Sequence, residues 1–306
     1  MNIKIATRQS PLALKQAELV KLAIKKHHPN VEVTFVPLVT QGDKLLDHHL
    51  ASFGGKGLFI KELEHALLEE KADIAVHSMK DMPGHLTPDL EMTAFMERDD
   101  PRDVLVSSQY KLLSDIPKNQ KIGTASLRRQ GMINFHRPDL TTETLRGNVN
   151  TRLSKLDAGQ YSAIILAAAG LHRLGLSKRI QYYFSPEDSI PAVGQGIIGI
   201  QCRKLDKKIK KILLPLDHLP SKICCMVERR FNRALEGNCH SPIGGYATLL
   251  NNQVHLRGCV YSLDKPICLK TEEHFSYDPA SLDKNIALAV TKLMDQGASE
   301  LLHHAK

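Results

Sequence analysis

Hydrophobic and polar residues follow two different periods in the first third of the chain. Segments 10–29 and 59–72 carry apolar residues at every third or fourth position, which is typical of amphipathic helices. Ser10 and Pro11 suit the N-cap and the first helical position of the earlier segment. Short apolar or alternating segments, which predict strands, lie at 2–8, 31–40 and 73–79. This order predicts an α/β domain whose largely parallel sheet has helices on both faces.

A similar order restarts after a charged, Pro-containing junction at 99–103. Strands are expected at 104–108, 141–147 and 161–175. A strand that turns into a helix is expected at 121–136, and a helix is expected at 150–159. The order of elements is the same as in the first third of the chain, but the amino-acid sequence is not. The pattern therefore predicts a second α/β domain.

The rest of the chain has a different character. Segment 191–202 combines Gly and Pro with a β-rich run, and 215–222 reads as a polar linker. Beyond it we expect a helix at 224–235, strands at 246–252, 253–262 and 265–276, and a closing helix from Ser281. This last part reads as a small α+β domain.

The patterns together predict three domains. Their expected bounds are 1–98 with 193–216, then 99–192, then 217–306. The first two would be hinged α/β domains of the periplasmic-binding-protein type with mixed, mainly parallel sheets. Such domains form a cleft between them, and ligands in α/β sheets bind at the carboxyl ends of the strands.

Composition narrows the class of ligand. The net charge is +8, from 41 basic and 33 acidic residues, which predicts an anionic partner. Only 5% of residues are aromatic, and the basic residues are scattered, so a small polyanion is favoured over nucleic acid. No apolar run is long enough for a membrane span, and no signal-like segment begins the chain, so we expect a cytoplasmic protein.

Neither the cysteines nor the histidines predict a metal site. The six cysteines form no CxxC pair, and the paired histidines have no partner cluster. Reduced thiols are expected in the cytoplasm. The cysteines are Cys202, Cys224, Cys225, Cys239, Cys259 and Cys268. Cys239 differs from the others in lying in a Gly-rich turn just after a predicted helix.

Cationic and hydroxyl side chains cluster where predicted strands end. Backbone N–H groups at helix N-termini already favour anions there, and guanidinium groups can bind planar carboxylates through two hydrogen bonds. The Gly-rich segment 54–63 lacks the phosphate-loop spacing, so Lys56 is expected on a mobile lid. The candidate anion-binding residues are Arg8, Ser10, Thr124, Ser126, Arg128, Arg129, Arg146, Arg152 and Arg173.

Asp81 is the candidate acid. The segment HSMKDMP follows the predicted strand 73–79 and places Ser78, Lys80 and Asp81 at the carboxyl edge of the sheet. Asp81 could be an ion-pair partner of Arg8 or Lys80, or a general acid–base group. His77 and Ser78 are adjacent on a strand and point to opposite faces, which argues against a catalytic triad.

Several motifs resemble one known family. In chain order they are ATRQSPLA, GGKGLF, ADIAVHSMKDMP, ERDDPRD, GTASLRRQ, LRGNVNTRLSKLDAG, PAVGQG and EGNCHSPIG. They are similar to motifs of porphobilinogen deaminase, also called hydroxymethylbilane synthase, over residues 3 to about 300. The resemblance implies an enzyme that joins four porphobilinogen molecules head to tail on a dipyrromethane primer, releases ammonia, and hydrolyses off a linear tetrapyrrole.

The resemblance also implies roles for individual residues. Cys239 would hold the dipyrromethane through a thioether, and Asp81 would be the catalytic carboxylate. The implied cofactor-binding residues are Lys80, Ser126, Arg128, Arg129, Arg146, Thr124, Ser78 and Asp43. The implied substrate-binding residues are Arg8, Ser10, Arg152, Arg173, Gln195 and Lys56. No metal, nucleic acid or membrane is implied, and a monomer is expected.

The chain departs from the family pattern near the lid. Some members carry a lysine where this chain has Ser52 and an arginine where it has Gln41, which leaves the lid here less positive.

Two other classes of protein fit part of the sequence. A solute-binding or ligand-sensing module fits the first two domains but not the third, and a nucleic-acid binder fits the net charge alone.

Overall fold

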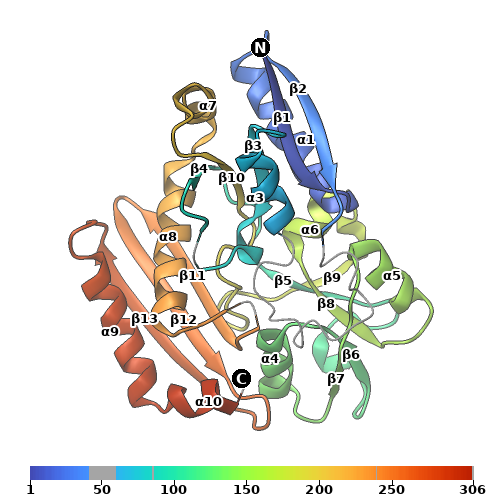
Figure 1. Ribbon diagram of the computed structural model, residues 1–306. Coiled ribbons are helices and arrows are strands. Elements are labelled where there is room, and N and C mark those ends of the chain that lie inside the picture. The colour runs from blue at the N-terminus through green and yellow to red at the C-terminus, as the bar shows by residue number, and fades with distance from the viewer. Residues whose placement is uncertain (41–59, 85, 239, 305–306) are drawn as a thin grey trace. The chain divides into compact units, whose positions relative to one another are not determined.

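The structure is a computed structural model (Figure 1). It describes residues 1–40, 60–84, 86–238 and 240–304. The chain forms two compact units, one of Met1–Arg98 with Ile197–Lys222 and one of Asp99–Gly196 with Ile223–Lys306. The division into three domains with the expected bounds stays a prediction.

A five-stranded sheet forms the centre of the first unit. Its strands are β1 (Asn2–Arg8), β2 (Glu32–Leu38), β3 (Ile74–Ser78), β4 (Leu90–Phe95) and β10 (Ile198–Arg203), in the order β2-β1-β3-β10-β4. Strand β1 pairs in parallel with β2 and β3, whereas β10 pairs antiparallel with β3 and β4. Within this sheet, as far as the structure describes it, β10 alone runs against the other strands.

Helices cover both faces of this sheet, as the hydrophobic pattern predicts. Helix α1 (Pro11–His27) presents Val20 and Ile24 to a core that contains Ile5, and α3 (Lys61–Leu68) presents Leu67 to a core that contains Ala6. Ile5 and Ala6 are consecutive on β1, so they point to opposite faces. Buried apolar side chains on both sides thus fix the sheet between its helices.

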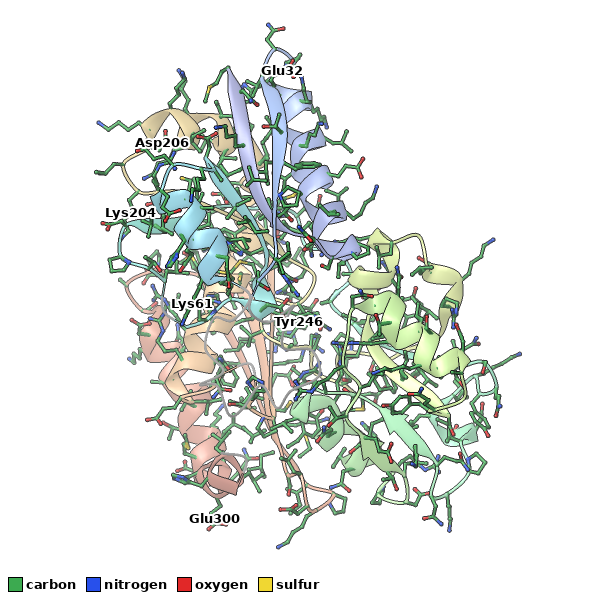
Figure 2. All side chains as sticks on the ribbon, turned by 45° about the vertical axis from the view of Figure 1, so that its right-hand side comes forward. Glu32, Lys61, Lys204, Asp206, Tyr246 and Glu300 are labelled. Carbon is green, nitrogen blue, oxygen red and sulfur yellow. The ribbon has the colours of Figure 1, made fainter. Side chains whose placement is uncertain are left out.

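The helix starts in this unit follow from local chemistry. The hydroxyl of Ser10 accepts a hydrogen bond from the backbone N–H of Ala13 at 3.4 Å, and Pro11 is the first residue of α1, so the predicted cap is confirmed. Helix α7 (Lys207–Leu213) begins after Asp206, whose carboxylate accepts from the backbone N–H of Ile209 at 3.0 Å. Figure 2 shows Asp206 beside Lys204 in the loop between β10 and α7.

The second unit repeats the arrangement of the first sheet. Its strands are β5 (Asp103–Val106), β6 (Lys121–Gly123), β7 (Thr141–Glu143), β8 (Ala163–Ala167) and β9 (Ile180–Tyr183), in the order β7-β6-β8-β5-β9. Strand β6 is parallel to β7 and β8, and β5 is antiparallel to β8 and β9. Strand β5 runs antiparallel to the other four strands, as β10 does in the first sheet. The predicted repeat of a mixed, mainly parallel α/β architecture is therefore confirmed.

Helices α4 (Leu127–His136), α5 (Val149–Asp157) and α6 (Ala168–Arg173) cover the second sheet. The prediction of a strand over the whole of 161–175 was wrong beyond residue 167, where α6 begins. Alanine has the highest helix propensity of the common residues, and the run of alanines at 167–169 favours the change from strand to helix.

The C-terminal part consists of an antiparallel sheet with helices. Its elements are α8 (Leu219–Ala234), β11 (Ile243–Leu250), β12 (Gln253–Tyr261), β13 (Cys268–Ser276), α9 (Leu282–Asp295) and α10 (Ala298–His304). Asn251 and Asn252 have positive φ values of 49° and 61° and form the two-residue turn between β11 and β12. The expected linker 215–222 is partly helical, since α8 begins at Leu219.

The two faces of this sheet have different partners within the second unit. Val254 and Leu256 belong to a core with α8 and α9, whereas Cys259 and Tyr261 belong to the core beneath α4. A Cβ atom at Gly131 on α4 would lie 2.3 Å from Cβ of Tyr261, so only glycine permits this approach. The 3-10 helices η2 (Met79–Asp81), η3 (Leu113–Asp115), η4 (Ser177–Arg179) and η5 (Leu214–Leu216) complete the described elements.

Candidate active site

Predicted ligand-binding residues lie at the carboxyl edge of the first sheet. Strands β1 and β3 are parallel neighbours, and Ala6 pairs with Ala75, so Arg8 at the end of β1 is level with His77. Ser78 ends β3, and Ser10 follows β1 as the N-cap of α1. The topology thus brings together residues that are about seventy positions apart in the chain.

Asp81 lies directly beyond this edge, on η2. Met79 of the same turn is 1% exposed, and its backbone N–H donates to the carbonyl of Ile197 at 3.0 Å, which fixes the turn to the start of β10. Asp81 itself is exposed, and its carboxylate makes no hydrogen bond or ion pair with a residue that the structure describes. A carboxylate in this position is held near the sheet and is open to a ligand.

Beneath this edge a chain of buried polar side chains begins at His77. Nε2 of His77 lies 2.9 Å from Oε1 of Gln201, whose amide nitrogen donates to Oε1 of Glu64 at 2.8 Å. The other oxygen of Glu64 accepts from the hydroxyl of Thr87 at 2.5 Å. Burial lowers the pKa of His77 to about 4, against the smaller opposing effects of Gln201, Glu64 and Asp81. His77 is therefore neutral at physiological pH.

The second sheet has a comparable edge. Strands β7, β6 and β8 are parallel neighbours, so the segments that follow them leave the sheet at one edge. Thr124 and Ser126 follow β6, with Ser126 at the N-cap of α4, and Arg146 follows β7. Arg152 lies in the first turn of α5, where its Nε donates to the carbonyl of Gly147 at 2.8 Å.

A buried ion cluster centred on Asp103 lies at the same edge. Asp103 begins the reversed strand β5 and pairs with Ala167 at the end of β8. The carboxylate is 0% exposed and lies 2.6 Å from Nη1 of Arg128 and 2.8 Å from Nη2 of Arg129. Burial alone would raise the pKa of Asp103, but the two arginines reverse this and lower it well below the usual value.

Both arginines of this cluster also bind backbone carbonyls. Arg128 donates to the carbonyl of Ile190 and Arg129 to that of Ile165, each at 2.9 Å. Two positive charges here face one negative charge, so the cluster keeps a net charge of +1. Nε of Arg128 is buried and has no hydrogen-bond partner among the described residues. Both arginines lie in the first turn of α4.

The segment before β10 is tied to this cluster. The side-chain amide of Gln195, 1% exposed, donates to Asp103 at 3.0 Å and to the carbonyl of Pro101 at 2.6 Å. Arg173 donates to the carbonyl of Gly196 at 2.6 Å and lies 3.3 Å from Asp99. Burial lowers the pKa of Arg173, although Asp99 opposes the shift.

Glu228 holds the same segment from the other side. One oxygen of its carboxylate accepts from the backbone N–H of Gly194 at 2.7 Å, and the other accepts from that of Ala247 at 2.8 Å. Glu228 lies on α8 and is 0% exposed. A single buried carboxylate therefore joins α8, β11 and the segment that precedes β10.

The structure brings the predicted residues together in two groups. Arg8, Ser10, Ser78, Lys80 and Asp81 share the first edge, and Thr124, Ser126, Arg128, Arg129 and Arg146 share the second. Arg152, Arg173 and Gln195 lie in segments next to the second group. Asp43, Lys56 and Cys239 lie outside the described residues, as do Gln41 and Ser52.

Four buried acids and amides of these edges escaped the sequence analysis: Glu64, Asp103, Gln201 and Glu228. The sequence identifies 99–103 only as a charged junction, yet Asp103 is buried, and Asp99 and Asp100 pair with Arg173 and Arg102. The one available signal for Asp103 is its place at the start of an apolar strand, directly after a proline-broken acidic run. Gln201 and Glu228 carry no comparable signal.

Two family models match most of the chain. Residues 3–211 match a model described as porphobilinogen deaminase, dipyromethane cofactor binding domain, and residues 222–291 match one described as porphobilinogen deaminase, C-terminal domain. Fold and matches together define an α/β enzyme of the transferase class, with a dipyrromethane cofactor. The chain belongs to the porphobilinogen deaminase family, and its activity is that of a hydroxymethylbilane synthase in tetrapyrrole biosynthesis.

Some solved structures resemble this chain at low sequence identity. The methionine-binding protein MetQ is 13% identical, with a TM-score of 0.45 over 70% of this chain and 89% of that one. The periplasmic VFT2 domain of Bordetella pertussis BvgS is 15% identical, with a TM-score of 0.40 over 70% and 86%. A TRAP periplasmic solute binding protein from Desulfovibrio salexigens is 13% identical, with a TM-score of 0.42 over 71% and 72%. Likenesses this distant say nothing about function.

The residues of the second edge fit a dipyrromethane. Its pyrrole rings carry acetate and propionate groups, which need cations and hydrogen-bond donors. The net charge of the Asp103 cluster, the unpartnered Nε of Arg128 and the N-terminus of α4 supply both.

No helix in the described part of the chain is long and apolar enough to cross a membrane.

The burial of His77 predicts a pH dependence of stability. Its folded pKa of about 4 lies below the ordinary value of 6.5, so the unfolded chain binds more protons between these values and stability falls with falling pH. Between pH 7 and pH 5, the free energy of unfolding, measured with urea, should fall by about 2 kcal/mol more for the wild type than for His77→Gln. His65→Gln, which changes an exposed histidine of α3, should behave like wild type. Equal pH dependence in wild type and His77→Gln would refute the buried neutral state.

Proposed function

We propose that this chain joins four porphobilinogen molecules head to tail on a dipyrromethane primer, releases one ammonia for each, and hydrolyses off hydroxymethylbilane. The observation that carries the proposal is the position of Asp81. It is an exposed carboxylate at the edge that also carries Arg8 and Lys80, and no described residue hydrogen-bonds to it. Family membership supplies the reaction class.

Asp81 is assigned the acid–base work. Breaking the carbon–nitrogen bond of porphobilinogen releases an amine that leaves as ammonia, and the substrate carbon becomes electron-poor. A nearby carboxylate stabilises positive charge on the pyrrole nitrogen of the substrate and moves the proton that accompanies the leaving amine. The exposure of Asp81 allows the substrate to reach it, and the anchoring of Met79 keeps it in place.

The basic residues are assigned to carboxylate binding. A charge-assisted hydrogen bond contributes about 1.5–3 kcal/mol when it is partly desolvated, so a few guanidinium groups bind a polycarboxylate firmly. Lys80, Ser126, Arg128, Arg129, Arg146, Thr124, Ser78 and Asp43 are proposed to hold the cofactor. Arg8, Ser10, Arg152, Arg173, Gln195 and Lys56 are proposed to hold substrate.

We expect some of these residues to bind a ligand directly and others to act through their charge. Arg128 and Arg129 already bind Asp103 and backbone carbonyls, so they act on a ligand mainly through the surplus charge of the cluster and through free donor atoms such as Nε of Arg128. Arg146 is half-buried and makes no hydrogen bond with a described residue, so its whole guanidinium group can serve a ligand.

Cys239 is assigned the attachment of the cofactor through a thioether. When bound, the dipyrromethane supplies the pyrrole carbon that accepts the first substrate. A covalent attachment makes each addition effectively intramolecular and removes much of its entropic cost. The other cysteines are poorer candidates, because Cys202, Cys224, Cys225 and Cys259 are buried and Cys268 is only partly exposed.

Asp81→Asn should lower turnover by about 10²–10⁴-fold, which is the usual contribution of general acid–base catalysis. Urea unfolding and the mass of the bound cofactor should be unchanged, since Asp81 is exposed. The matched control is Asp89→Asn, an exposed aspartate that precedes β4 and so lies at the opposite edge of the sheet. Near-normal turnover of Asp81→Asn would remove Asp81 from this role.

Cys239→Ser should yield a protein whose intact mass lacks the dipyrromethane. The control is Cys268→Ser, which changes the partly exposed thiol on β13 and should leave the added mass in place. The attachment site is wrong if Cys239→Ser keeps the added mass or if Cys268→Ser loses it. Intact-mass spectrometry of the purified proteins distinguishes these outcomes.

A further inference from the structure

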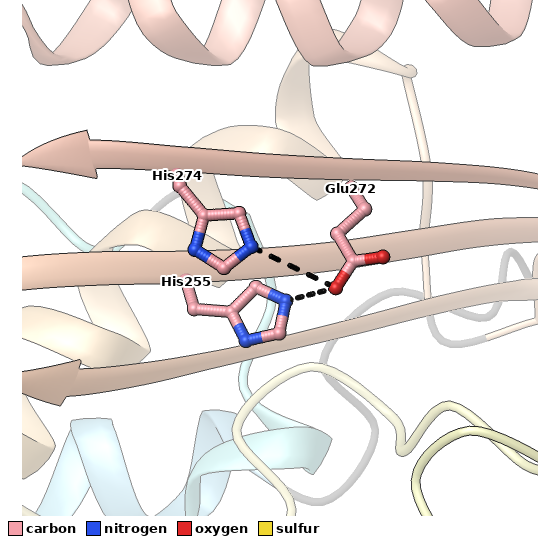
Figure 3. A group of neighbouring side chains, drawn as sticks. All are labelled: His255, Glu272 and His274. Carbon is pink, nitrogen blue, oxygen red and sulfur yellow. Dashed lines mark hydrogen bonds and ion pairs between the residues drawn. The ribbon is translucent and has the colours of Figure 1, made fainter.

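Three potential metal ligands meet on the C-terminal sheet. His255 lies on β12, and Glu272 and His274 lie on β13. The strand register pairs His255 directly with His274, and Glu272 precedes His274 by two residues, so all three side chains point to one face. Figure 3 shows the two imidazole rings side by side, with the carboxylate of Glu272 at their Nε2 ends.

The ligand atoms of these three side chains are nearly as close together as the ligand atoms of a metal site. The imidazole rings are stacked, with centroids 4.1 Å apart and planes inclined by 15°. Nε2 of His255 hydrogen-bonds to Oε1 of Glu272, and Nε2 of His274 lies 3.8 Å from the same oxygen. One ligand atom of each residue lies within 4.8 Å of the others. In a tetrahedral zinc site two ligand atoms are roughly 3.3 Å apart, so small side-chain rotations suffice.

The side chains have the freedom for these rotations. Glu272 and His274 are 58% and 68% exposed, whereas the less exposed His255, at 26%, would be the fixed member. Exposure also leaves room for water as a further ligand, which sites with three protein ligands commonly bind. Neutral imidazole can place its proton on Nδ1, which frees the Nε2 lone pair for a metal without any net loss of protons.

The basic residue opposite Glu272 on the neighbouring strand does not occupy its carboxylate. Arg257 faces Glu272 across the strand pair, but its guanidinium group binds Glu187 and lies 5.4 Å from the ring centre of Tyr246. Glu272 is therefore left to the two histidines. A carboxylate oxygen with two imidazole nitrogens is the donor set that zinc binds in other proteins, and copper and nickel bind such donors as well.

We propose that His255, Glu272 and His274 bind a divalent transition-metal ion, with Zn²⁺ as the probe of choice. The ion would clamp β12 to β13 and stabilise the C-terminal sheet, because it binds the folded arrangement and not the unfolded chain. The site takes no part in the proposed reaction, and its existence does not depend on the roles of Asp81 or Cys239.

The test is calorimetric titration of Zn²⁺ into the untagged protein after chelator treatment and buffer exchange. The wild type should bind one Zn²⁺ ion. His274→Gln and Glu272→Gln should each lower the affinity for this ion at least tenfold. His303→Gln, which changes an exposed histidine of α10, is the matched control and should bind within about twofold of wild type. The exposure of His274 makes its substitution safe for folding.

Absorption of the Co²⁺-loaded protein identifies the ligands. Nitrogen and oxygen ligands should give visible bands without the charge-transfer band of a thiolate, which would mark binding at a cysteine. The proposal fails if wild type binds no Zn²⁺, if His274→Gln binds as tightly as wild type, or if the cobalt spectrum shows thiolate ligation.

Discussion

The second unit depends on one buried carboxylate shared by two arginines. Asp103 would be costly to bury alone, and so would Arg128 and Arg129, because charges removed from water need close partners. Their contact at 2.6 and 2.8 Å satisfies all three and fixes the start of β5 against α4. Gln195 adds a third segment to the same carboxylate. The cluster therefore fixes three distant parts of the chain at one strand edge.

The same cluster gives that edge its charge. Because only one negative charge faces two positive charges, a surplus remains at the N-terminus of α4, where the helix dipole has the same sign. The first unit also carries charged residues at one edge of its sheet, with Arg8 at the end of β1 and Lys80 and Asp81 on η2. In each sheet one reversed strand, β5 or β10, follows the passage between the units and begins at this edge. Structural residues and the residues proposed to bind ligands thus alternate at these edges.

Much of the fold could be predicted because it depends on local patterns. The strand at 2–8, the cap at Ser10 and the first-turn positions of Arg128 and Arg129 all follow from neighbouring residues. The helix α6 could have been predicted from its alanines. The burial of Asp103 could not, since its partners lie 26 and 92 residues away. The residue pattern singled out Asp81 and Cys239, and the family resemblance added the roles that are proposed for them. A cross-strand group such as His255 with His274 requires the strand register.

The most direct measurement of the Asp103 cluster is urea unfolding of Asp103→Asn beside Asp139→Asn. Both substitutions remove a carboxylate that pairs with arginine, but Asp103 is fully buried and Asp139 is 28% exposed. Loss of Asp103 leaves two buried guanidinium groups without a counter-charge, so the free energy of unfolding should fall by about 3–5 kcal/mol. Asp139→Asn should cause a much smaller loss. Equal losses in the two variants would contradict the central structural role of Asp103.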